Sequence, residues 1–270
     1  MSLDHKFAQL KRNLHELESV AVAFSGGVDS TFLIKVAHDV LGTRAIAVTA
    51  TSSTYPQREF QEACQLAEGI GIQHVVIESE ELDIEGFAQN PRDRCYYCKR
   101  ELFTKVRTAA AKHGIGHVAD GSNFDDLQDI RPGMQAAAEL AVVSPLKECQ
   151  LTKEDIRVLS RNLDLPTWQK PAFACLSSRF PYGESITSEK LAMVDQAEEY
   201  LLSLGFRQLR VRHHGEMARI EVPLQEIRRF FEEDLLQPVS QRFHIIGFTY
   251  VTLDMDGYRT GSMNEATEAS

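Results

Sequence analysis

The sequence lacks any long hydrophobic run. No segment of its 270 residues approaches the roughly 18 consecutive apolar residues that a membrane-spanning helix needs. The first residues, MSLDHKFAQLKRNLHELE, mix both charges at helical spacing and lack the apolar core of a signal peptide. We therefore expect a cytoplasmic protein without a membrane partner.

Positive charge is also scarce. The chain has 29 Lys and Arg residues against 39 Asp and Glu residues, a formal net charge of −10. Affinity for nucleic acids comes mainly from basic side chains that neutralise phosphates, and this balance argues against such contact. We expect no nucleic-acid partner.

Cysteines are few, and their count is odd. Five cysteines without an export signal argue against disulfides and in favour of metal-binding or reactive thiols. Cys95 and Cys98 form a CxxC pair, and Cys175 lies in KPAFACLSSRFPYG. Three thiolates suit an iron–sulfur cluster with one open iron or a catalytic metal with a vacant position, whereas no second CxxC or HxxxH completes a structural zinc site. We expect Cys64 and Cys149 to be buried, inert thiols.

The first half of the chain alternates short apolar runs with helical patterns. The runs are nearly continuous in apolar residues, as in parallel strands covered on both faces. Strand, helix and strand in repetition predict an α/β fold with a doubly wound parallel sheet and right-handed crossovers. The predicted strands span residues 20–24, 45–50, 74–79 and 116–122.

From about residue 181 the pattern changes. A long amphipathic helix is followed by two alternating strands around a predicted hairpin at residues 214–216. Another helix is expected in LQEIRRFFEEDL and a last strand in HIIGFTYVTLDMD. We predict two domains: a doubly wound domain over residues 1–165 and a smaller α+β domain over residues 166–270.

Two polar turns follow predicted strands at the edge where doubly wound sheets bind ligands. In AVAFSGGVDST, two glycines can leave backbone N–H groups bare at a helix N-terminus, which makes an anion site, and the serines add hydroxyl donors. The lysine of a Walker A motif is absent. The expected binding residues of this loop are Ser25, Gly26, Gly27, Asp29 and Ser30.

The second polar turn is DGSNFDD, after the fourth predicted strand. A turn with ordinary N-cap chemistry is one interpretation. Its place at the same sheet edge favours a nucleotide or metal role, which we assign to Asp120, Gly121 and Asp126.

Two arginines alternate with apolar residues in QLRVRHH. Period-two alternation places Arg210 and Arg212 on one face of a strand, about 7 Å apart. Two guanidinium groups at that spacing match a phosphate. A solvated strand face is the ordinary alternative.

The glycine loop FSGGVDS resembles the signature of the PP-loop ATP pyrophosphatases. Five segments in order, SGGVDS, DGSNFDDLQDIRPG, CLSSRFPYG, LRVRHHGEMARIE and LDMDGYRTGSMN, resemble the LarE-type ATP-dependent sulfur transferases over about residues 15–264. The resemblance implies that the loop binds the pyrophosphate of ATP, that Asp29 helps hold Mg²⁺, and that ATP is split to AMP and pyrophosphate. It implies a mononucleotide substrate, pyridinium-3,5-biscarboxylic acid mononucleotide, whose adenylated carboxylates become thiocarboxylates for the nickel-pincer cofactor of lactate racemase.

The resemblance also assigns roles to individual residues. It implies that the two strand arginines hold the substrate phosphate, with Arg259 a weaker candidate. It places Ser178 and Arg179 in the active site beside the Cys175 loop, together with Glu198, for which a surface carboxylate is the alternative. Family members are often hexameric, so a homo-oligomer is expected.

Two sulfur routes occur in families of this kind. One passes on a sulfide or persulfide sulfur bound to a [4Fe-4S] cluster, and the presence of Cys95, Cys98 and Cys175 favours it here. The other sacrifices a single cysteine, here Cys175, which is left as dehydroalanine. The competing functions are a tRNA thiolase, an amide-forming synthetase of the GMP or NAD kind, and a non-enzymatic nucleotide-binding module.

Overall fold

The structure, a computed structural model, describes residues 1–128, 132–171, 174–259 and 262–263. Its packing divides the chain into two units. The N-terminal unit comprises Met1–Ile84 and Asp93–Phe173, and the C-terminal unit comprises Glu85–Arg92 and Ala174–Ser270. The sequence placed the boundary between residues 165 and 166, and it assigned no part of residues 85–92 to the second domain. Parts of two motifs, at residues 129–131 and 260–261, lie outside the described residues.

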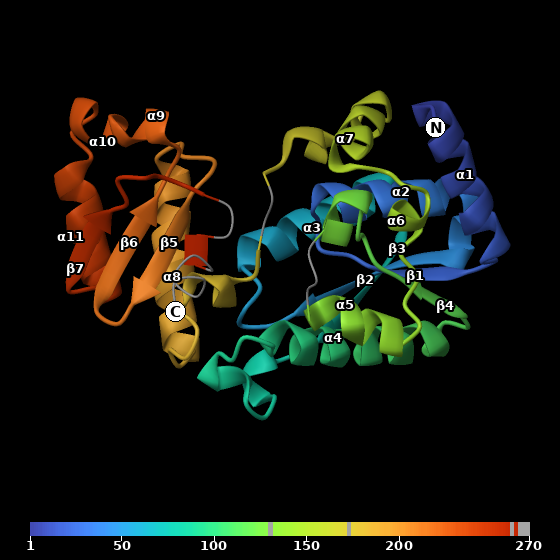
Figure 1. Ribbon diagram of the computed structural model, residues 1–270, viewed down its shortest axis with the longest axis horizontal. Helices are drawn as coiled ribbons and strands as arrows, with labels where there is room; N and C mark the ends of the chain where they lie inside the picture. Colours follow the sequence, from blue (N-terminus) through green and yellow to red (C-terminus); the bar gives the residue numbers. More distant parts are fainter. Residues whose placement is uncertain (129–131, 172–173, 260–261, 264–270) are drawn as a thin grey trace. The chain divides into compact units, whose positions relative to one another are not determined.

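The N-terminal unit is built on a parallel sheet of four strands in the order β3-β2-β1-β4 (Figure 1). The four predicted strands are confirmed, and the fourth ends early because a polar turn begins at Asp120. Since the order reverses after β3, the ends of β1 and β4 lie side by side, where such sheets bind ligands. The strands are β1 (Val20–Ala23), β2 (Ala45–Thr51), β3 (Gln73–Glu78) and β4 (His117–Ala119).

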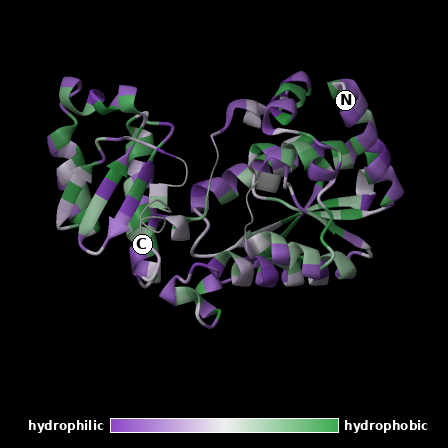
Figure 2. Ribbon diagram, in the orientation of Figure 1, coloured by the Kyte–Doolittle hydropathy of each residue, from purple (hydrophilic) through white to green (hydrophobic). Residues whose placement is uncertain are grey.

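Helices cover both faces of this sheet (Figure 1). Val20 and Val22 of β1 pack in one core with α1 (Leu3–Glu16), α2 (Val28–Leu41), α3 (Gln57–Ile70) and α7 (Lys153–Asn162), whereas Ala21 packs in a second core with α4 (Arg94–Lys112). The alternation follows the period of two in a strand. Figure 2 shows the strands as largely hydrophobic along their length, as the sequence pattern predicts. The short helices α5 (Pro132–Glu139) and α6 (Pro145–Glu148) follow β4.

The C-terminal unit has a three-stranded sheet in the order β5-β6-β7. The predicted hairpin is confirmed: β5 (Arg210–His214) pairs antiparallel with β6 (Met217–Glu221), and β7 (Tyr250–Leu253) pairs parallel with β6. The predicted long helix is α8 (Ser188–Ser203), which packs on β5 and on α11 (Leu236–Ile246).

Two predictions for this unit are wrong. Residues 224–235 form two short helices, α9 (Leu224–Ile227) and α10 (Arg229–Glu232), instead of one. The HII segment expected to begin the last strand is the end of α11, because Val239 and Phe243 recur at helical spacing and bury one face of that helix.

Residues 85–92 are joined to the C-terminal unit by hydrogen bonds from both side chain and backbone. The Asn90 amide nitrogen Nδ2 donates to the carbonyl of Phe180 at 3.3 Å and to that of Pro181 at 2.7 Å. The N–H of Ile186 donates to the carbonyl of Ala88. In the described part of the chain, no helix combines the length and the apolar character that crossing a membrane requires.

Candidate functional site

The glycine loop connects β1 to α2 at the carboxyl edge of the sheet. Gly26 has φ +66°, which favours glycine, and a Cβ there would lie 3.2 Å from the Ala63 Cβ on α3. Gly27 is the N-cap of α2. Within the described residues, the backbone N–H groups of residues 26–29 donate no hydrogen bond. Bare amides at a helix N-terminus are an arrangement that suits an anion, and binding of an anion by this loop stays a prediction.

The serine hydroxyls shape the loop from within. The Ser25 N–H donates to the Ser30 Oγ at 3.3 Å, and the two hydroxyl oxygens lie 3.2 Å apart. The Ser30 hydroxyl also donates to the Gly27 carbonyl at 3.3 Å. Both predicted serines therefore lie in the loop and stabilise its turn.

Asp29 occupies the first turn of α2 and pairs with a lysine that sequence reasoning missed. The Lys153 Nζ lies 2.6 Å from Asp29 Oδ2, whereas Asp29 Oδ1 is buried without a hydrogen-bond partner in the described structure. Burial raises the pKa of Asp29, and the Lys153 ammonium opposes the rise. A half-satisfied carboxylate beside bare amides fits a cation that accompanies phosphates.

The second polar turn meets the glycine loop. Gly121 approaches α2 so closely that a Cβ there would lie 3.1 Å from the Ser30 nitrogen. Asp120 accepts hydrogen bonds from the hydroxyls of Ser122 at 2.7 Å and Ser144 at 2.8 Å. The two predicted segments are therefore adjacent in space.

Asp126 has a local role in the same turn. Its carboxylate accepts the Asn123 N–H at 3.0 Å, and the Asn123 side chain accepts the Asp125 N–H at 2.9 Å. These bonds cap the short helix η4 (Phe124–Gln128), as in the N-cap interpretation. The negative charge of Asp126 also contributes to raising the pKa of Asp29, which indicates that the two carboxylates are neighbours.

Two further residues of the N-terminal unit contact the loop and were missed from the sequence. The Tyr55 hydroxyl donates to the Ser25 carbonyl at 3.0 Å, and Lys170 Nζ donates to the Gly26 carbonyl at 3.2 Å. Lys170 is 144 residues from Gly26 in the chain. No sequence motif relates such distant positions, so only the fold could identify them.

The predicted metal-binding cysteines are divided between the two units. Cys95 and Cys98 lie three residues apart at the start of α4, and Cys175 precedes the short helix η6 (Leu176–Arg179) of the C-terminal unit. Cys95 and Cys175 are exposed, and the Cys98 Sγ lies 3.8 Å from Glu81 Oε1. Across the described ranges, no three His, Cys, Asp or Glu side chains form a group that could hold a metal ion. The three-thiol site stays a prediction.

The other two cysteines differ from each other. Cys149 is fully buried in the core, and burial raises the pKa of its thiol to about 11. The inert thiol predicted there fits this environment. Cys64 is only half-buried on α3, so the burial predicted for it is wrong.

A buried ion pair organises the Cys175 loop. Arg179 is fully buried, and its Nε and Nη2 donate to the two carboxylate oxygens of Glu198, each at 2.9 Å. Its Nη1 donates to the carbonyls of Ala174 and Cys175 and to the Ser178 hydroxyl at 2.9 Å. Arg179 therefore fixes the backbone that carries Cys175.

Glu198 is a buried partner and not a surface carboxylate. Its side chain is 2% exposed, which makes the surface alternative wrong. Burial would raise the pKa of Glu198, but the charge and hydrogen bonds of Arg179 and the Val211 N–H lower it below its ordinary range. The pair is ionised and bidentate, the geometry in which arginine and carboxylate match best.

Arg210 and Arg212 project from one face of β5 and are both buried. The solvated-face alternative is therefore wrong, since only 9% and 5% of the two residues are exposed. Arg210 lies over the Tyr258 ring, and burial, together with the charge of Arg179, lowers its pKa.

Arg212 is held by a second buried carboxylate. Its Nη2 donates to Glu221 at 2.8 Å and to the Ser262 hydroxyl at 3.1 Å, and its Nη1 donates to the Ser178 carbonyl at 3.0 Å. In the described structure the buried Nε of Arg212 has no hydrogen-bond partner. Arg259 lies 3.8 Å from Asp254, so its positive charge is partly balanced.

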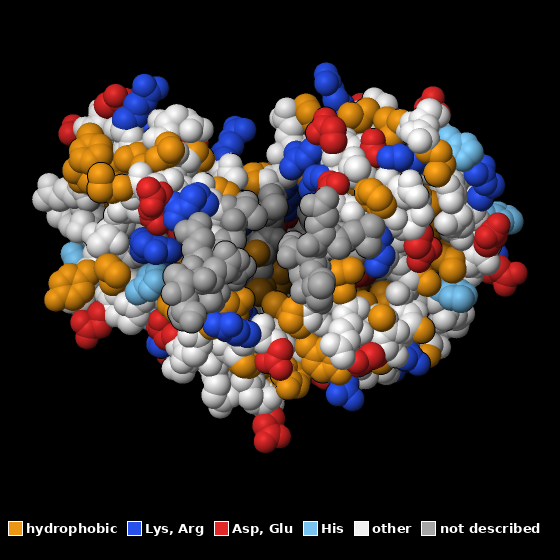
Figure 3. Space-filling view, viewed as in Figure 1, with side chains coloured by type: hydrophobic (Ala, Val, Ile, Leu, Met, Phe, Trp, Pro, Cys, Tyr) orange, Lys and Arg blue, Asp and Glu red, His pale blue; other side chains and the backbone are white. Residues whose placement is uncertain are grey.

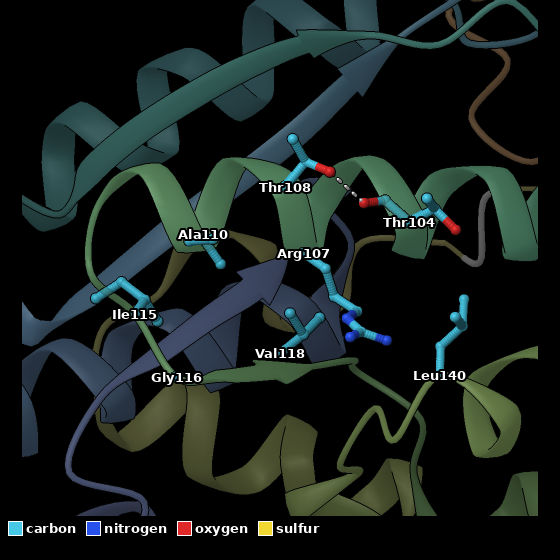
Figure 4. A pocket seen from close by; sticks show the side chains of 9 residues that line it. Thr104, Arg107, Thr108, Ala110, Ile115, Gly116, Val118 and Leu140 are labelled. Carbon is cyan, nitrogen blue, oxygen red and sulfur yellow. Dashed lines mark hydrogen bonds between the residues drawn. The ribbon is translucent and has the colours of Figure 1, made fainter.

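One surface cavity lies elsewhere on the N-terminal unit (Figure 4). It has a volume of about 530 Å³ between the second half of α4 and β4, with Arg107, Val118 and Leu140 in its wall. None of its lining residues belongs to the glycine loop or to the turn after β4. Figure 3 shows basic side chains interspersed with acidic ones on the face in view, without a broad basic area.

Comparison with known proteins gives relatives over the whole chain. The chain is 40% identical to the pyridinium-3,5-bisthiocarboxylic acid mononucleotide synthase of Lactiplantibacillus plantarum over 98% of this chain and 95% of that protein. It is 46% identical to an uncharacterized protein of Synechocystis over 97% of this chain and 98% of that protein.

More distant similarity covers parts of the chain. A glutamine-hydrolysing GMP synthase of Aeropyrum pernix is 25% identical over 70% of this chain and 40% of that protein. The family model described as NAD synthase matches residues 4–110, which include the glycine loop and the CxxC pair.

Proposed function

We propose that this chain is an ATP-dependent sulfur transferase, on the premise that it belongs to the LarE-type family of pyridinium-3,5-bisthiocarboxylic acid mononucleotide synthases. The observation that carries the proposal is 40% identity to such a synthase over 98% of this chain. Its substrate would be pyridinium-3,5-biscarboxylic acid mononucleotide, whose carboxylates it would convert to thiocarboxylates. The product would serve the nickel-pincer nucleotide cofactor of lactate racemase.

Activation by ATP answers a chemical difficulty. A carboxylate repels nucleophiles and has a poor leaving group, and transfer of AMP onto it removes both obstacles. The bare N–H groups of residues 26–29 would bind the pyrophosphate of ATP and stabilise its negative charge as it departs. Since the loop already holds these amides in place, the protein would need little reorganisation when the pyrophosphate departs.

Magnesium would bind beside that loop. Mg²⁺ takes oxygen ligands and accompanies phosphates, which fits the buried, unpartnered Oδ1 of Asp29, with Asp126 nearby. Lys153 now neutralises Asp29, and it would be free to contact a phosphate oxygen once a metal ion took its place. Asp120 and Gly121 would line the same nucleotide site.

The C-terminal unit would bind the phosphate of the substrate. Arg210 and Arg212 offer guanidinium groups from one face of β5, and Arg259 could add a third. The planar guanidinium group of arginine suits the phosphate of a mononucleotide. Held at that end, the substrate would be oriented for reaction at its carboxylate.

Sulfur would be supplied through cysteine. The thiols of Cys95, Cys98 and Cys175 are the right ligands for a [4Fe-4S] cluster, and two of them share one face of α4. When bound, such a cluster would supply sulfur that originates from sulfide or a persulfide. Arg179 and Ser178 would hold the loop of Cys175 in place. Sacrifice of the exposed Cys175 is the alternative source.

A self-associating protein is also proposed. Among the residues that the structure describes, six of the eleven exposed large hydrophobic ones lie in the C-terminal unit, the smaller of the two. Contiguous exposed apolar surface is typical of subunit interfaces. The six are Leu224, Phe231, Leu236, Ile245, Tyr250 and Met255.

The test combines product and protein analysis. The purified chain, prepared anaerobically with iron and sulfide, is incubated with Mg–ATP and the biscarboxylate mononucleotide. We expect AMP, pyrophosphate and a product in which sulfur replaces oxygen. Release of pyrophosphate only with ammonia, giving an amide, would instead support a synthetase of the GMP kind.

The sulfur source is decided on the same samples. A Cys95→Ala variant should lose bound iron and acid-labile sulfide, whereas Cys64→Ala, a change on α3, should retain both. Equal iron in all three proteins would contradict the cluster. A loss of one H₂S from the intact chain after turnover would show that Cys175 is consumed.

A further inference from the structure

Two carbonyl groups of the glycine loop are held by side chains from outside the loop. The Ser25 carbonyl accepts the Tyr55 hydroxyl at 3.0 Å, and the Gly26 carbonyl accepts Lys170 Nζ at 3.2 Å. Tyr55 lies just before α3, and Lys170 follows the short helix η5 (Pro166–Gln169). The two anchors therefore reach the loop from separate segments of the N-terminal unit.

Fixing a carbonyl also fixes the amide of the next residue. In a trans peptide the C=O and the N–H point in opposite directions within one plane, and the peptide bonds of this loop are trans. Tyr55 holds the peptide that carries the N–H of Gly26, and Lys170 holds the peptide that carries the N–H of Gly27. Both N–H groups consequently point away from the anchors, and neither donates a hydrogen bond within the described residues.

The Lys170 ammonium group is surrounded by three oxygen atoms of the protein. An ammonium group has three N–H donors. The Nζ of Lys170 lies 2.8 Å from Glu59 Oε2, 2.8 Å from Glu62 Oε2 and 3.2 Å from the Gly26 carbonyl. The two glutamates also balance its charge. A basic residue so close to an anion site would ordinarily bind the anion, but this one is committed to the loop and to α3.

Tyr55 is likewise suited to hold the loop. Burial, with the charges of Glu59 and Glu62, raises the pKa of Tyr55 above its ordinary value, so its hydroxyl stays protonated and remains a donor. The loop is also packed on α3, since the Gly26 position lies against Ala63. The side of the loop that bears the carbonyls is thus occupied by protein.

We propose that Tyr55 and Lys170 are positioning residues that hold the amides of Gly26 and Gly27 ready for the pyrophosphate part of ATP. The inference rests on the proposed function and goes beyond it, because it assigns the order of the anion site to two residues that do not touch the anion. If the inference holds, loss of either anchor weakens the binding of the triphosphate and leaves the binding of the adenosine part unchanged.

The main test is Tyr55→Phe, which removes one hydroxyl. Calorimetric titration with Mg–ATP should give a dissociation constant raised roughly three- to tenfold, the effect of one hydrogen bond. Titration with AMP, which lacks the pyrophosphate, should be unchanged. Tyr200→Phe on α8 is the matched control, since no hydrogen bond of its hydroxyl is recorded in the described structure, and it should match wild type with both ligands.

Lys170 is tested by loss and recovery. Lys170→Met should weaken Mg–ATP and spare AMP, and Lys170→Arg, which keeps the charge and several donors, should recover most of the loss. If wild type fails to bind Mg–ATP, both the proposed function and the inference fail. If wild type binds and the variants bind equally well, or if ATP and AMP weaken in the same proportion, the inference alone is overturned.

Discussion

Replacing Glu198 by glutamine should destabilise the C-terminal unit far more than replacing the neighbouring Glu199 by glutamine. Both members of the Arg179–Glu198 pair are buried, with 0% and 2% of their side chains exposed. Removing one charge of such a pair leaves the other uncompensated, which typically costs about 3–5 kcal/mol. Glutamine keeps one oxygen for the Val211 N–H, so we expect the lower end, about 3 kcal/mol.

The two units can be followed separately. Trp168 is the only tryptophan and lies in the N-terminal unit, so its fluorescence reports unfolding there. Hydrogen exchange measured by mass spectrometry reports the amides of β5 and α8. In Glu198→Gln those amides should lose protection while the urea midpoint of Trp168 fluorescence stays unchanged. Glu199→Gln, an exposed site on the same helix, is the control.

The pH dependence gives a second readout of the same pair. The pKa of Glu198 is lower in the folded protein than in the unfolded chain. Its contribution to the free energy of unfolding is therefore complete above the unfolded pKa of about 4.3, and it is lost as pH falls through the folded pKa. Wild type should therefore lose β5 protection in acid, and Glu198→Gln should lack this part of the profile. Equal stability of Glu198→Gln and Glu199→Gln at neutral pH would refute the reasoning.

Three other predictions concern the N-terminal unit. Gly26→Ala should abolish Mg–ATP binding, and in urea titrations it should destabilise this unit more than Gly114→Ala. Both glycines have positive φ, but only a Cβ at Gly26 would meet a close neighbour, so the comparison separates the steric clash from backbone strain. Iodoacetamide at pH 8 should label Cys149 last, since its thiol is buried and its pKa of about 11 leaves little thiolate, as peptide mass spectrometry over time would show. Asp29→Asn should raise the Mg²⁺ concentration needed for half-maximal ATP binding at least tenfold and leave AMP binding unaltered; an unchanged Mg²⁺ requirement would exclude Asp29 as a ligand.

Part of the candidate site could be read directly from the sequence. The glycine loop and the polar turn after β4 each follow a buried strand, and the chain order of strands and helices predicts that both lie at the same sheet edge. Gly121 does approach Ser30 there. The arginines of β5 were placed on one face by the period of two, although both proved buried.

Their partners could not be predicted in this way. Glu221 lies nine residues from Arg212, on the other strand of the hairpin, and Lys153 lies 124 residues from Asp29. Ion pairs between distant positions leave no periodic signal, since they depend on which surfaces the core brings together. Burial of Glu198 was equally hidden, because its helix α8 reads as an ordinary amphipathic pattern.

The sequence by itself determined the local elements: the alternating strands and helices, the bend at Gly26 and Gly27, and the helix followed by a hairpin. These follow from side-chain periodicity and backbone sterics, which act over a few residues. Only the tertiary structure decided that Tyr55 and Lys170 hold the glycine loop and that residues 85–92 belong with the C-terminal unit. Those arrangements come from long-range packing, in which each contact depends on the whole fold being formed.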